Sequence, residues 1–480
     1  MSNWQNRDVV VIGSGPNGLA AAITMARAGC TVTVYEAEPT IGGGARSGAL
    51  TLPGFIHDVC SSVHALAAAS PFVQSLPLED LGLGLKWIHP EFPLAHPFDD
   101  GTAITVSRSL PETSSRFGAD SQAVQRLFEP SVRSWSQLSS EILRPARLPR
   151  HPLHLARFGW HALPSAATIA LRSFKTEKAR AVFAGMSAHS IMPLTSLGSS
   201  AFGILLWTMC HAVGWPFVAG GSQSIANALA SYLRKIGGNI VTNRRVSSLD
   251  DLPPNCVILC DLTPRQLLEI AGKRISAAER SRLSSYRYGP GVFKVDWSLA
   301  APIPWNAPEC RKAGTVHLGA TFQEIAAWEQ ACWSNSRAAQ PFVLVTQPSL
   351  FDSSRAPDGK HTAWGYCHVP HASALDMTDR IESQVERFAS GFRKQILQRA
   401  VMSPHDFERR NGNLIGGDIS GGAMTLRRLL LRSTRRSYTT GIDRVFLCSS
   451  STAPGPGVHG LCGYYAAQLA LEKHFKGRHR

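Results

Sequence analysis

The sequence predicts an α/β fold in which one parallel sheet is assembled from separate segments of the chain and an α+β domain is interleaved with it. Residues 8–36 read as an apolar run, a glycine-rich turn, an alanine-rich helical stretch and a second apolar run, which is the pattern of a βαβ unit. Three more short apolar runs, near residues 240, 258 and 446, are typical of buried parallel strands. Because these runs lie far apart in the sequence, the stretches between them must form the second domain.

Length and composition set the size of the two domains. Of the 480 residues, 44% are hydrophobic and 17% are charged, which is typical of a well-packed globular protein and not of a disordered one. A chain of this length holds two or three structural units. We expect the parallel-sheet domain to take 1–80, 216–270 and 416–480, and the second domain, helical in its first part, to take 81–215 and 271–415.

The chain is strongly basic, with a formal net charge of +15. Its densest basic cluster consists of Arg427, Arg428, Arg432, Arg435 and Arg436. We interpret this cluster as a solvated face, with peripheral contact to a membrane surface or a partner as the alternative. No nucleic-acid-binding motif accompanies it, so nucleic acid is not an expected partner.

The cysteines and the N-terminal residues indicate the compartment. The ten cysteines are scattered, and the nearest pair, Cys256 and Cys260, brackets an apolar run. Such cysteines are typical of reduced, mostly buried thiols, and the sequence has no spacing typical of a metal site. The stretch from Met1 to Arg7 is short and polar and leads directly into a strand, which favours a cytoplasmic location.

The first predicted strand, at 8–12, leads into a glycine fingerprint. The fingerprint consists of Gly13, Ser14, Gly15, Pro16, Asn17 and Gly18. Gly13 allows a tight turn, Gly15 lets the backbone approach a pyrophosphate, and Gly18 lets helix and strand pack closely. The N-terminus of the following helix offers free N–H groups and a partial positive charge to the linked phosphates. The pattern predicts a Rossmann-like dinucleotide site.

Glu36 closes the second predicted strand, at 31–35, and Ala37 follows it. A carboxylate here accepts hydrogen bonds from a ribose hydroxyl and repels a 2′-phosphate, so a 2′-phosphorylated nucleotide is disfavoured. A second glycine turn comes next, and its candidate cofactor contacts are Gly43, Gly44, Ala45 and Arg46. The Arg46 guanidinium can bind a diphosphate as a charged fork, the alternative being an exposed loop arginine.

The glycine turn at 41–47, which in two-domain flavoproteins lies against the dinucleotide, favours FAD over NAD, and two absences narrow the class of flavoprotein. No other predicted strand is followed by a GxGxxG motif, so a separate NAD(P)H domain is not expected. Cys60 stands alone after the first βαβ unit, where disulphide reductases carry a redox pair. The sequence therefore points away from reductases and towards oxidases and desaturases that use FAD.

Further motifs extend over nearly the whole chain. They lie at 8–36, 41–47, 215–221, 288–296, 315–319, 355–364, 416–419 and 447–465. With these motifs the chain resembles the carotenoid/retinoid oxidoreductase family, the phytoene desaturase-like flavoproteins. Within that family it is most similar to the branch that contains pyridine nucleotide-disulphide oxidoreductase domain-containing protein 2.

The resemblance implies FAD bound without a covalent link and a substrate domain over the reactive face of the flavin. It implies that Val246 contacts the adenine through its backbone. It places Gly457, Val458 and His459 of the closing loop at the isoalloxazine ring, with the N-terminus of the last helix directed at the ring. Many related flavoproteins carry an acidic residue in the loop after the last strand. Here that loop is Ser449–Thr452, so a hydroxyl such as that of Ser450, or the carboxylate of Asp418, takes its place.

A long stretch without charged side chains, 181–233, predicts the substrate environment. Its most apolar part is interrupted by Gly203, Gly214 and Pro216, which disfavours a membrane-spanning helix. We interpret the stretch as a helix pair that lines an apolar pocket, with Leu206 and Trp207 as candidate wall residues. The alternative is that the stretch is simply core.

The resemblance implies an FAD-dependent oxidoreductase that dehydrogenates, or desaturates, a small apolar substrate by hydride transfer to flavin and passes electrons to oxygen or a quinone. The candidate catalytic residues are His459, as a proton acceptor, and Tyr464, as an aromatic wall beside the flavin. The alternatives are a backbone-bonded loop histidine and a packed helix residue. Three other functions stay open for the whole chain: a flavin amine oxidase, a flavin-binding regulatory protein with little turnover, and an isomerase that uses reduced flavin.

Overall fold

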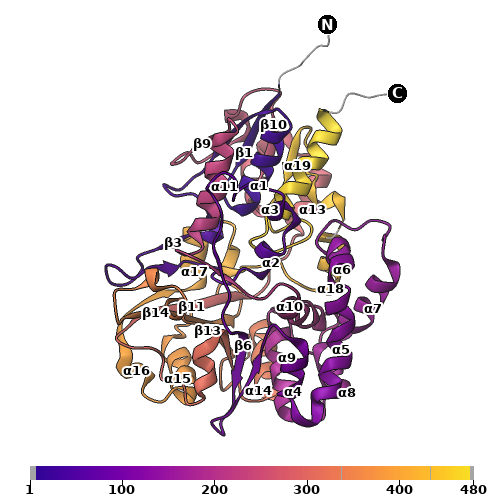
Figure 1. Ribbon diagram of the computed structural model, residues 1–480. Coiled ribbons are helices and arrows are strands. Elements are labelled where there is room, and N and C mark those ends of the chain that lie inside the picture. The colour runs from indigo at the N-terminus through magenta and orange to yellow at the C-terminus, as the bar shows by residue number, and fades with distance from the viewer. Residues whose placement is uncertain (1–6, 337, 433, 476–480) are drawn as a thin grey trace.

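The computed structural model describes residues 7–336, 338–432 and 434–475. A five-stranded parallel sheet lies in its upper part (Figure 1). Its strands, in spatial order, are β16 (Val445–Leu447), β10 (Val257–Cys260), β1 (Asp8–Ile12), β2 (Thr31–Tyr35) and β9 (Asn239–Val241). These are the five strands that the sequence predicts, so the prediction of one parallel sheet built from separate segments is confirmed. Residues 1–6, on which the location prediction depends, lie outside the described residues.

Helices cover both faces of this sheet because alternate strand residues point to two different cores. Val9 and Val11 face one core, and Val10 and Ile12 face the other. The helices of the first core are α1 (Pro16–Arg27), α11 (Gln223–Lys235) and α19 (Leu461–His474). Those of the second core are α12 (Pro264–Ile270) and α13 (Ala277–Ser284). A strand buried on both faces is continuously apolar, which is why this sheet is visible in the sequence.

The first and last helices pack together although they come from opposite ends of the chain. A Cβ atom at Gly463 of α19 would lie 1.7 Å from the carbonyl oxygen of Asn17 in α1. Any side chain at position 463 would therefore push the two helices apart. Glycine at this point lets α19 close the sheet domain over the N-terminus of α1, where the glycine fingerprint lies.

A seven-stranded mixed sheet forms the lower part of the molecule (Figure 1). In spatial order its strands are β15 (Ile396–Met402), β11 (Gly291–Leu299), β14 (His361–Val369), β13 (Val343–Thr346), β12 (Ala313–Leu318), β6 (Phe92–Pro97) and β7 (Ala103–Val106). Only β12 and β6 pair in parallel; the other neighbours are antiparallel. Two short ribbons, β3 (Ser47–Gly48) with β4 (His57–Asp58) and β5 (Trp87–Ile88) with β8 (Phe217–Val218), lie outside both sheets.

A group of helices packs beside the seven-stranded sheet (Figure 1). It consists of α4 (Leu110–Ser115), α5 (Ser121–Arg133), α6 (Trp135–Ile142), α7 (Pro152–Ala162), α8 (Ala166–Ser173), α9 (Glu177–Ala188) and α10 (Ser200–Ala212). The remaining longer helices are α14 (Phe322–Ser334), α15 (Thr378–Phe388), α17 (Pro404–Arg410) and α18 (Leu426–Arg432). Short helical turns occur at α2 (Ala65–Ala68), α3 (Pro71–Gln74) and α16 (Phe392–Gln395). The α+β character expected of the second domain is therefore present.

The uncharged stretch 181–233 forms the end of α9, α10, β8 and most of α11. Helices α9 and α10 pack against each other, as the interpretation of a helix pair requires. Trp207 of α10 is fully buried and stacks on Phe128 with ring centroids 4.3 Å apart. Across 7–336, 338–432 and 434–475, the structure contains no helix with the length and apolarity needed to span a bilayer.

The basic cluster at 427–436 is not a uniformly solvated face. Arg432 is 5% exposed, and its guanidinium donates to the carbonyl oxygens of Ser420 and Gly422 at 3.3 and 3.0 Å. The prediction of a solvated side chain is therefore wrong for Arg432, because this arginine ties α18 to the preceding loop. Arg427 is exposed, as predicted, and the side chain of Arg435 lies outside the described residues.

Candidate functional site

A cavity of about 640 Å³ lies between the two sheets. From the parallel sheet, it is lined by Ile12, Tyr35 and Asp261, at the carboxyl ends of β1, β2 and β10. From the mixed sheet, it is lined by residues of four strands: Val292, Lys294, Thr315, Leu344, Trp364 and Tyr366. The carboxyl edge of a parallel sheet is where α/β proteins bind ligands. The cavity therefore extends from the carboxyl edge of the parallel sheet to a chamber on the mixed sheet.

Most of the cofactor-binding residues predicted from the sequence line this one cavity. They are Gly13, Ser14, Gly15, Pro16, Asn17, Glu36, Ala37, Gly43, Gly44, Arg46, Val246, Ser450, Gly457 and Val458. Gly18, Ala45 and His459 are not among the lining residues. The structure thus brings together groups from four distant parts of the sequence.

The glycine turn packs so tightly that only hydrogen fits at two of its positions. A Cβ atom at Gly18 would lie 2.1 Å from the carbonyl oxygen of Gly13, and one at Gly15 would lie 2.7 Å from Oδ2 of Asp261. Gly13 itself has a φ of +98°, in the left-handed region. Helix α1 begins directly after this turn with Pro16, whose missing N–H costs nothing at a first helical position. The N-terminus of α1 thus faces the cavity through Pro16 and Asn17, while the Gly18 N–H behind them is bonded to Asp261.

Glu36 is held in place from three sides. Its carboxylate accepts hydrogen bonds from the Ser14 N–H at 2.9 Å and the Ser14 hydroxyl at 2.5 Å. It also accepts from the Glu38 N–H at 3.0 Å and forms a 3.5 Å ion pair with Arg46. These contacts fix the carboxylate at the rim of the cavity, where the sequence places the ribose of a dinucleotide.

The Arg46 side chain is not the exposed loop arginine that the sequence left open as an alternative, since its side chain is only 14% exposed. It donates to the Arg410 carbonyl oxygen at 3.2 Å. Its Nε atom is buried and has no hydrogen-bond partner among the described residues, and the same holds for Oδ1 of Asn17. Both residues line the cavity. The unpartnered Arg46 donor beside a helix N-terminus fits an anionic ligand such as a diphosphate, and the unpartnered Asn17 acceptor fits a ligand that also carries a donor.

Asp261 is a site residue that the sequence reasoning missed. It follows β10, is buried, and accepts the Gly18 N–H at 3.0 Å. Burial raises its pKa to about 7, the Gly18 hydrogen bond opposes this rise, and the neighbouring Glu36 charge adds to it. Its position in the sequence could have identified it, because Asp261 directly follows a parallel strand, as Glu36 does.

Lys294 is the second residue that sequence reasoning missed. It points from β11 into the cavity with a side chain only 2% exposed. Its ammonium group donates to both carboxylate oxygens of Asp296 at 2.5 Å and to the Asp58 carbonyl oxygen at 2.9 Å. It also lies 5.2 Å from the centre of the Trp364 ring. The signal was a lysine with an aspartate two residues later, Lys294 and Asp296, on one face of the mainly apolar strand Gly291–Leu299.

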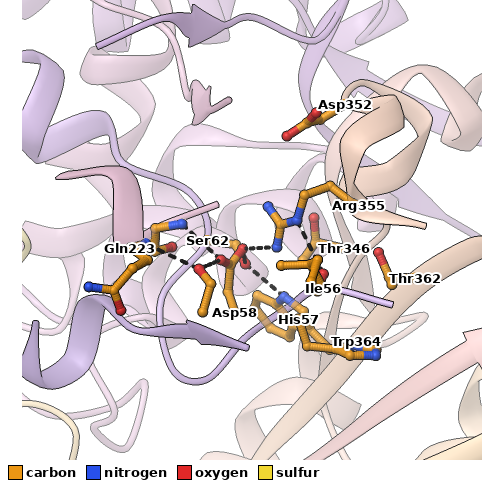
Figure 2. A network of polar contacts seen from close by, with 12 residues as sticks. Ile56, His57, Asp58, Ser62, Gln223, Thr346, Asp352, Arg355, Thr362 and Trp364 are labelled. Carbon is orange, nitrogen blue, oxygen red and sulfur yellow. Dashed lines mark hydrogen bonds and ion pairs between the residues drawn. The ribbon is translucent and has the colours of Figure 1, made fainter. Parts of the chain in front are cut away.

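A polar network connects β4 to the mixed sheet behind this wall (Figure 2). Asp58 forms a 2.8 Å ion pair with Arg355, and each side chain is 1% exposed. The Asp58 carboxylate also accepts from the hydroxyls of Ser47 and Ser62 at 2.7 and 2.5 Å and from the Ser222 N–H at 2.9 Å. Burial works against ionisation of Asp58, but the Arg355 charge and these hydrogen bonds outweigh it and lower the pKa to about 2.

The network also fixes an aromatic wall of the cavity. The indole N–H of Trp364 donates to the Ser62 hydroxyl at 2.8 Å (Figure 2). Trp364 and Ser62 both line the cavity. The Arg355 Nε donates to the Ile56 carbonyl oxygen at 3.1 Å. Residues 56–62 are thereby anchored to the mixed sheet.

The chamber on the mixed sheet is largely apolar. Leu206 lines it from α10, as the sequence predicts, whereas Trp207 is not among the lining residues and faces the core. A histidine lies at the same end: Nε2 of His189 is 3.0 Å from Nε2 of His317. Burial lowers the pKa of His189 to about 3, so its ring is neutral at physiological pH. The chamber thus suits a mainly apolar, uncharged molecule.

The two candidate catalytic residues do not line the cavity. His459 is 1% exposed and its Nδ1 accepts the Leu461 N–H at 2.9 Å, which ties the loop to the start of α19. Burial lowers its pKa to about 4. Tyr464 packs on Phe72 and Tyr465, with ring centroids 5.6 and 5.1 Å away. These are the arrangements named as alternatives, a backbone-bonded loop histidine and a packed helix residue.

Asp418, the candidate substitute for the missing loop acid, is turned away from the cavity. Its carboxylate accepts the N–H groups of Gly289 and Ser420, each at 2.7 Å. Ser450 of the same candidate pair does line the cavity. The structure therefore favours the hydroxyl over the carboxylate as the loop group that reaches a ligand.

Comparisons with known proteins agree with this geometry. The family model described as flavin containing amine oxidoreductase matches residues 17–462. The rat pyridine nucleotide-disulfide oxidoreductase domain-containing protein 2 is 25% identical over 97% of this chain and 93% of its own. A lycopene-forming phytoene desaturase from a Paracoccus species is 22% identical over 95% of both chains. The solved structure of putrescine oxidase bound to putrescine covers 97% of this chain and 98% of its own, with a TM-score of 0.61 and 16% identity.

The family match extends over nearly the whole chain and includes the mixed sheet, four of the five strands of the parallel sheet and most of the residues that line the cavity. It agrees with the resemblance that the sequence motifs suggested, because phytoene desaturases are among the relatives. The putrescine oxidase structure has the same fold as this chain, and at 16% identity the likeness shows the fold alone. The chain therefore belongs to the family of flavin-containing amine oxidoreductases.

Proposed function

We propose that this protein is an FAD-dependent oxidoreductase that holds FAD without a covalent link and dehydrogenates a small apolar substrate by hydride transfer to the flavin. The observation that carries the proposal is the single cavity. It begins at the glycine turn and Glu36 and ends in an apolar chamber on the mixed sheet. An anionic cofactor bound at the first end and an apolar substrate bound at the second can therefore meet inside this cavity.

The residues at the first end are suited to a dinucleotide. The N-terminus of α1 and the Arg46 guanidinium would hold the diphosphate, and Glu36 would accept the ribose hydroxyls. The two glycine turns pack directly on each other, since a Cβ atom at Gly43 would lie only 3.1 Å from the Gly15 Cα. Glycine at both positions therefore lets the two turns lie side by side at the cavity. FAD, when bound, supplies the hydride acceptor.

The residues at the second end position and shelter a substrate. Leu206, Val292 and Leu344 exclude water from the chamber. Lys294 is the charged group that the mixed sheet contributes to the described lining, and its charge is balanced by Asp296. The neutral His189 can share a hydrogen bond with a polar group of the substrate. A substrate without acidic C–H groups has no need of a strong base here, because hydride loss leads and water or a weak base takes the proton.

An amine oxidase is the second candidate, because the family name and the shared fold of putrescine oxidase favour it. A protonated amine would need an acidic partner in the chamber. The acidic residues that line the described cavity are Glu36, Glu38, Asp261 and Glu269, and all of them lie on the side of the parallel sheet. This distribution favours an uncharged substrate over a cationic one.

Flavin content and anaerobic reduction test the proposal. We expect purified protein to be yellow, to release FAD on heat denaturation, and to bleach anaerobically with apolar, partly conjugated compounds but not with primary amines. Bleaching by amines with peroxide release would favour the amine oxidase, and stable colour with both classes would favour a flavin-binding protein with little turnover. Folded protein that is colourless and takes up no added FAD would contradict the proposal.

A charge in the chamber should stop turnover without removing the cofactor. In Leu206→Glu the carboxylate would enter an apolar wall of the chamber, so we expect turnover to fall at least about tenfold. Because Leu206 is not part of the glycine turn, we expect the flavin absorbance per protein to stay unchanged. Leu375→Glu is the matched control, because Leu375 is 60% exposed and outside the cavity lining. Equal turnover of wild type and Leu206→Glu would show that the chamber does not hold the substrate.

A further inference from the structure

The segment around α7 exposes large apolar side chains to solvent. Leu148 is 91% exposed, Leu153 83%, Trp160 78% and Leu163 54%. Leu153 and Trp160 are seven residues apart on α7, so they lie on one face of the helix. Single exposed leucines are ordinary in proteins, but four large apolar side chains within 16 residues are not.

This face continues onto two other segments of the chain. The Gly198 N–H donates to the Leu163 carbonyl oxygen at 2.8 Å, and the neighbouring Leu197 is 64% exposed. A Cβ at Gly198 would meet the Leu426 side chain at 3.5 Å, so α18 begins against the same point. Along α18, Leu430 and Leu431 are 61% and 55% exposed. We call Leu148, Leu153, Trp160, Leu163, Leu197, Leu430 and Leu431 the apolar face.

The charge around the apolar face is entirely positive. Residues 142–176 contain no Asp or Glu and carry the basic residues Arg144, Arg147, Arg150, Arg157, Arg172 and Lys175. Residues 419–442 likewise contain no acid and carry Arg427, Arg428, Arg432, Arg435 and Arg436. Of these, the exposed residues are Arg150, Arg157, Arg172, Lys175, Arg427 and Arg436. Helices that lie in the interface of an anionic bilayer typically have this composition, in which exposed leucine and tryptophan alternate with arginine.

We propose that the apolar face docks onto an anionic membrane surface. Leu153 and Trp160 enter the headgroup boundary, and Arg157 and Arg427 lie against lipid phosphates. The arginine cluster recognised in the sequence takes part through Arg427, and α7 contributes most of the apolar contact. This assigns the peripheral membrane contact to a defined surface of the fold.

A second copy of the chain is a weaker occupant for the same face. A two-fold symmetric contact would bring Arg157 and Arg427 of one copy against those of the other. The segments that carry the apolar face have no carboxylate to offset that repulsion. A bilayer with anionic lipids offers both the apolar layer and the counter-charge.

The position of the face matches an apolar substrate. Helix α7 packs on α10, and Leu206 of α10 lines the cavity. One helix therefore separates the proposed membrane contact from the proposed substrate chamber. This link rests on the proposed function, whereas the membrane contact itself does not.

Vesicle flotation tests the membrane contact with the full-length protein. We expect the wild type to float with vesicles of phosphatidylcholine and phosphatidylglycerol in a 7:3 ratio, but not with phosphatidylcholine alone, and to be released by 0.5 M salt. In the double variant Leu153→Ser/Trp160→Ser, flotation should weaken at least about tenfold. The matched control is Leu375→Ser/Leu397→Ser, because these leucines are 60% and 47% exposed elsewhere on the surface and should leave flotation unchanged.

Three results would overturn this inference. The first is a wild type that does not float with anionic vesicles. The second is equal flotation of the two double variants. The third is a wild-type dimer, seen by sedimentation velocity, that dissociates in Leu153→Ser/Trp160→Ser while flotation is unchanged, which would assign the face to a second copy. Flavin absorbance of each variant reports separately on the proposed function, so an inactive but yellow and floating protein would fail only that proposal.

Discussion

Gly18→Ala is expected to give a protein that retains little flavin and whose free energy of unfolding is lower by about 3 kcal/mol. The added methyl group would lie 2.1 Å from the Gly13 carbonyl oxygen and 3.3 Å from the Asp261 Cβ. The Gly13 turn cannot yield, because its N–H donates to the Tyr35 carbonyl oxygen at 2.8 Å. Helix α1 would have to move away from β1, and its N-terminus would leave the phosphate position.

Urea unfolding and the ratio of flavin to protein absorbance measure this effect. Gly48→Ala is the matched control, because a Cβ at Gly48 meets no atom within 4 Å and the residue has no positive φ. We expect the control to keep wild-type flavin content and stability within about 0.5 kcal/mol. A yellow Gly18→Ala protein with wild-type stability would show that the glycine turn does not position the dinucleotide.

The end of the cavity that we propose for the dinucleotide was predictable because its determinants are local in sequence. Strand, glycine turn, helix and second strand follow each other within residues 8–36, and the bonded pair Ser14 and Glu36 is only 22 residues apart. The buried strands β10 and β16 were recognisable as uninterrupted apolar runs. Local periodicity therefore predicted the parallel sheet and most of the residues that line its carboxyl edge.

The roles of Asp261 and Lys294 were not predictable, because each residue meets a partner from a distant segment through the fold. Asp261 reaches the N–H of Gly18 across 243 residues, and Lys294 reaches the Asp58 carbonyl oxygen across 236. In the sequence, Asp261 is a single acid after an apolar strand, and Lys294 has only Asp296 as a partner within its own strand. Their role follows from burial and from the pairing of distant segments, which no local pattern contains.

The closing loop shows the limit of a motif in a different way. The motif assigned Gly457 and Val458 to the cofactor, and both line the cavity. It did not give the side-chain directions of His459 and Tyr464, which point into packed surroundings at the base of α19. Rotamers depend on neighbours such as Phe72, and those neighbours come from another part of the chain.

Arg355→Met is expected to lower the free energy of unfolding by about 3–5 kcal/mol, because it leaves the Asp58 carboxylate buried without its counter-charge. Arg355 and Asp58 are each 1% exposed. Arg393→Met is the matched control: its 2.7 Å pair with Asp379 has the same chemistry, but the two side chains are 40% and 81% exposed. We expect this control to cost less than about 1 kcal/mol. The double variant Asp58→Asn/Arg355→Met should recover part of the loss, since no buried charge remains.

The pH dependence of this loss distinguishes a missing ion pair from a packing defect. In the wild type the pKa of Asp58 is lowered to about 2, below its unfolded value of about 3.9. Its contribution to stability is therefore complete above pH 4 and is lost as the pH falls through 2. In Arg355→Met the lowering by the Arg355 charge is lost, while burial, the largest cause, still acts against the hydrogen bonds from Ser47, Ser62 and Ser222. The pKa of Asp58 therefore rises, and the variant gains stability relative to the wild type as the pH falls. Urea unfolding from pH 7 to pH 3 should show the difference between the two proteins becoming smaller; a difference that stays constant would mean that Arg355 acts through packing alone.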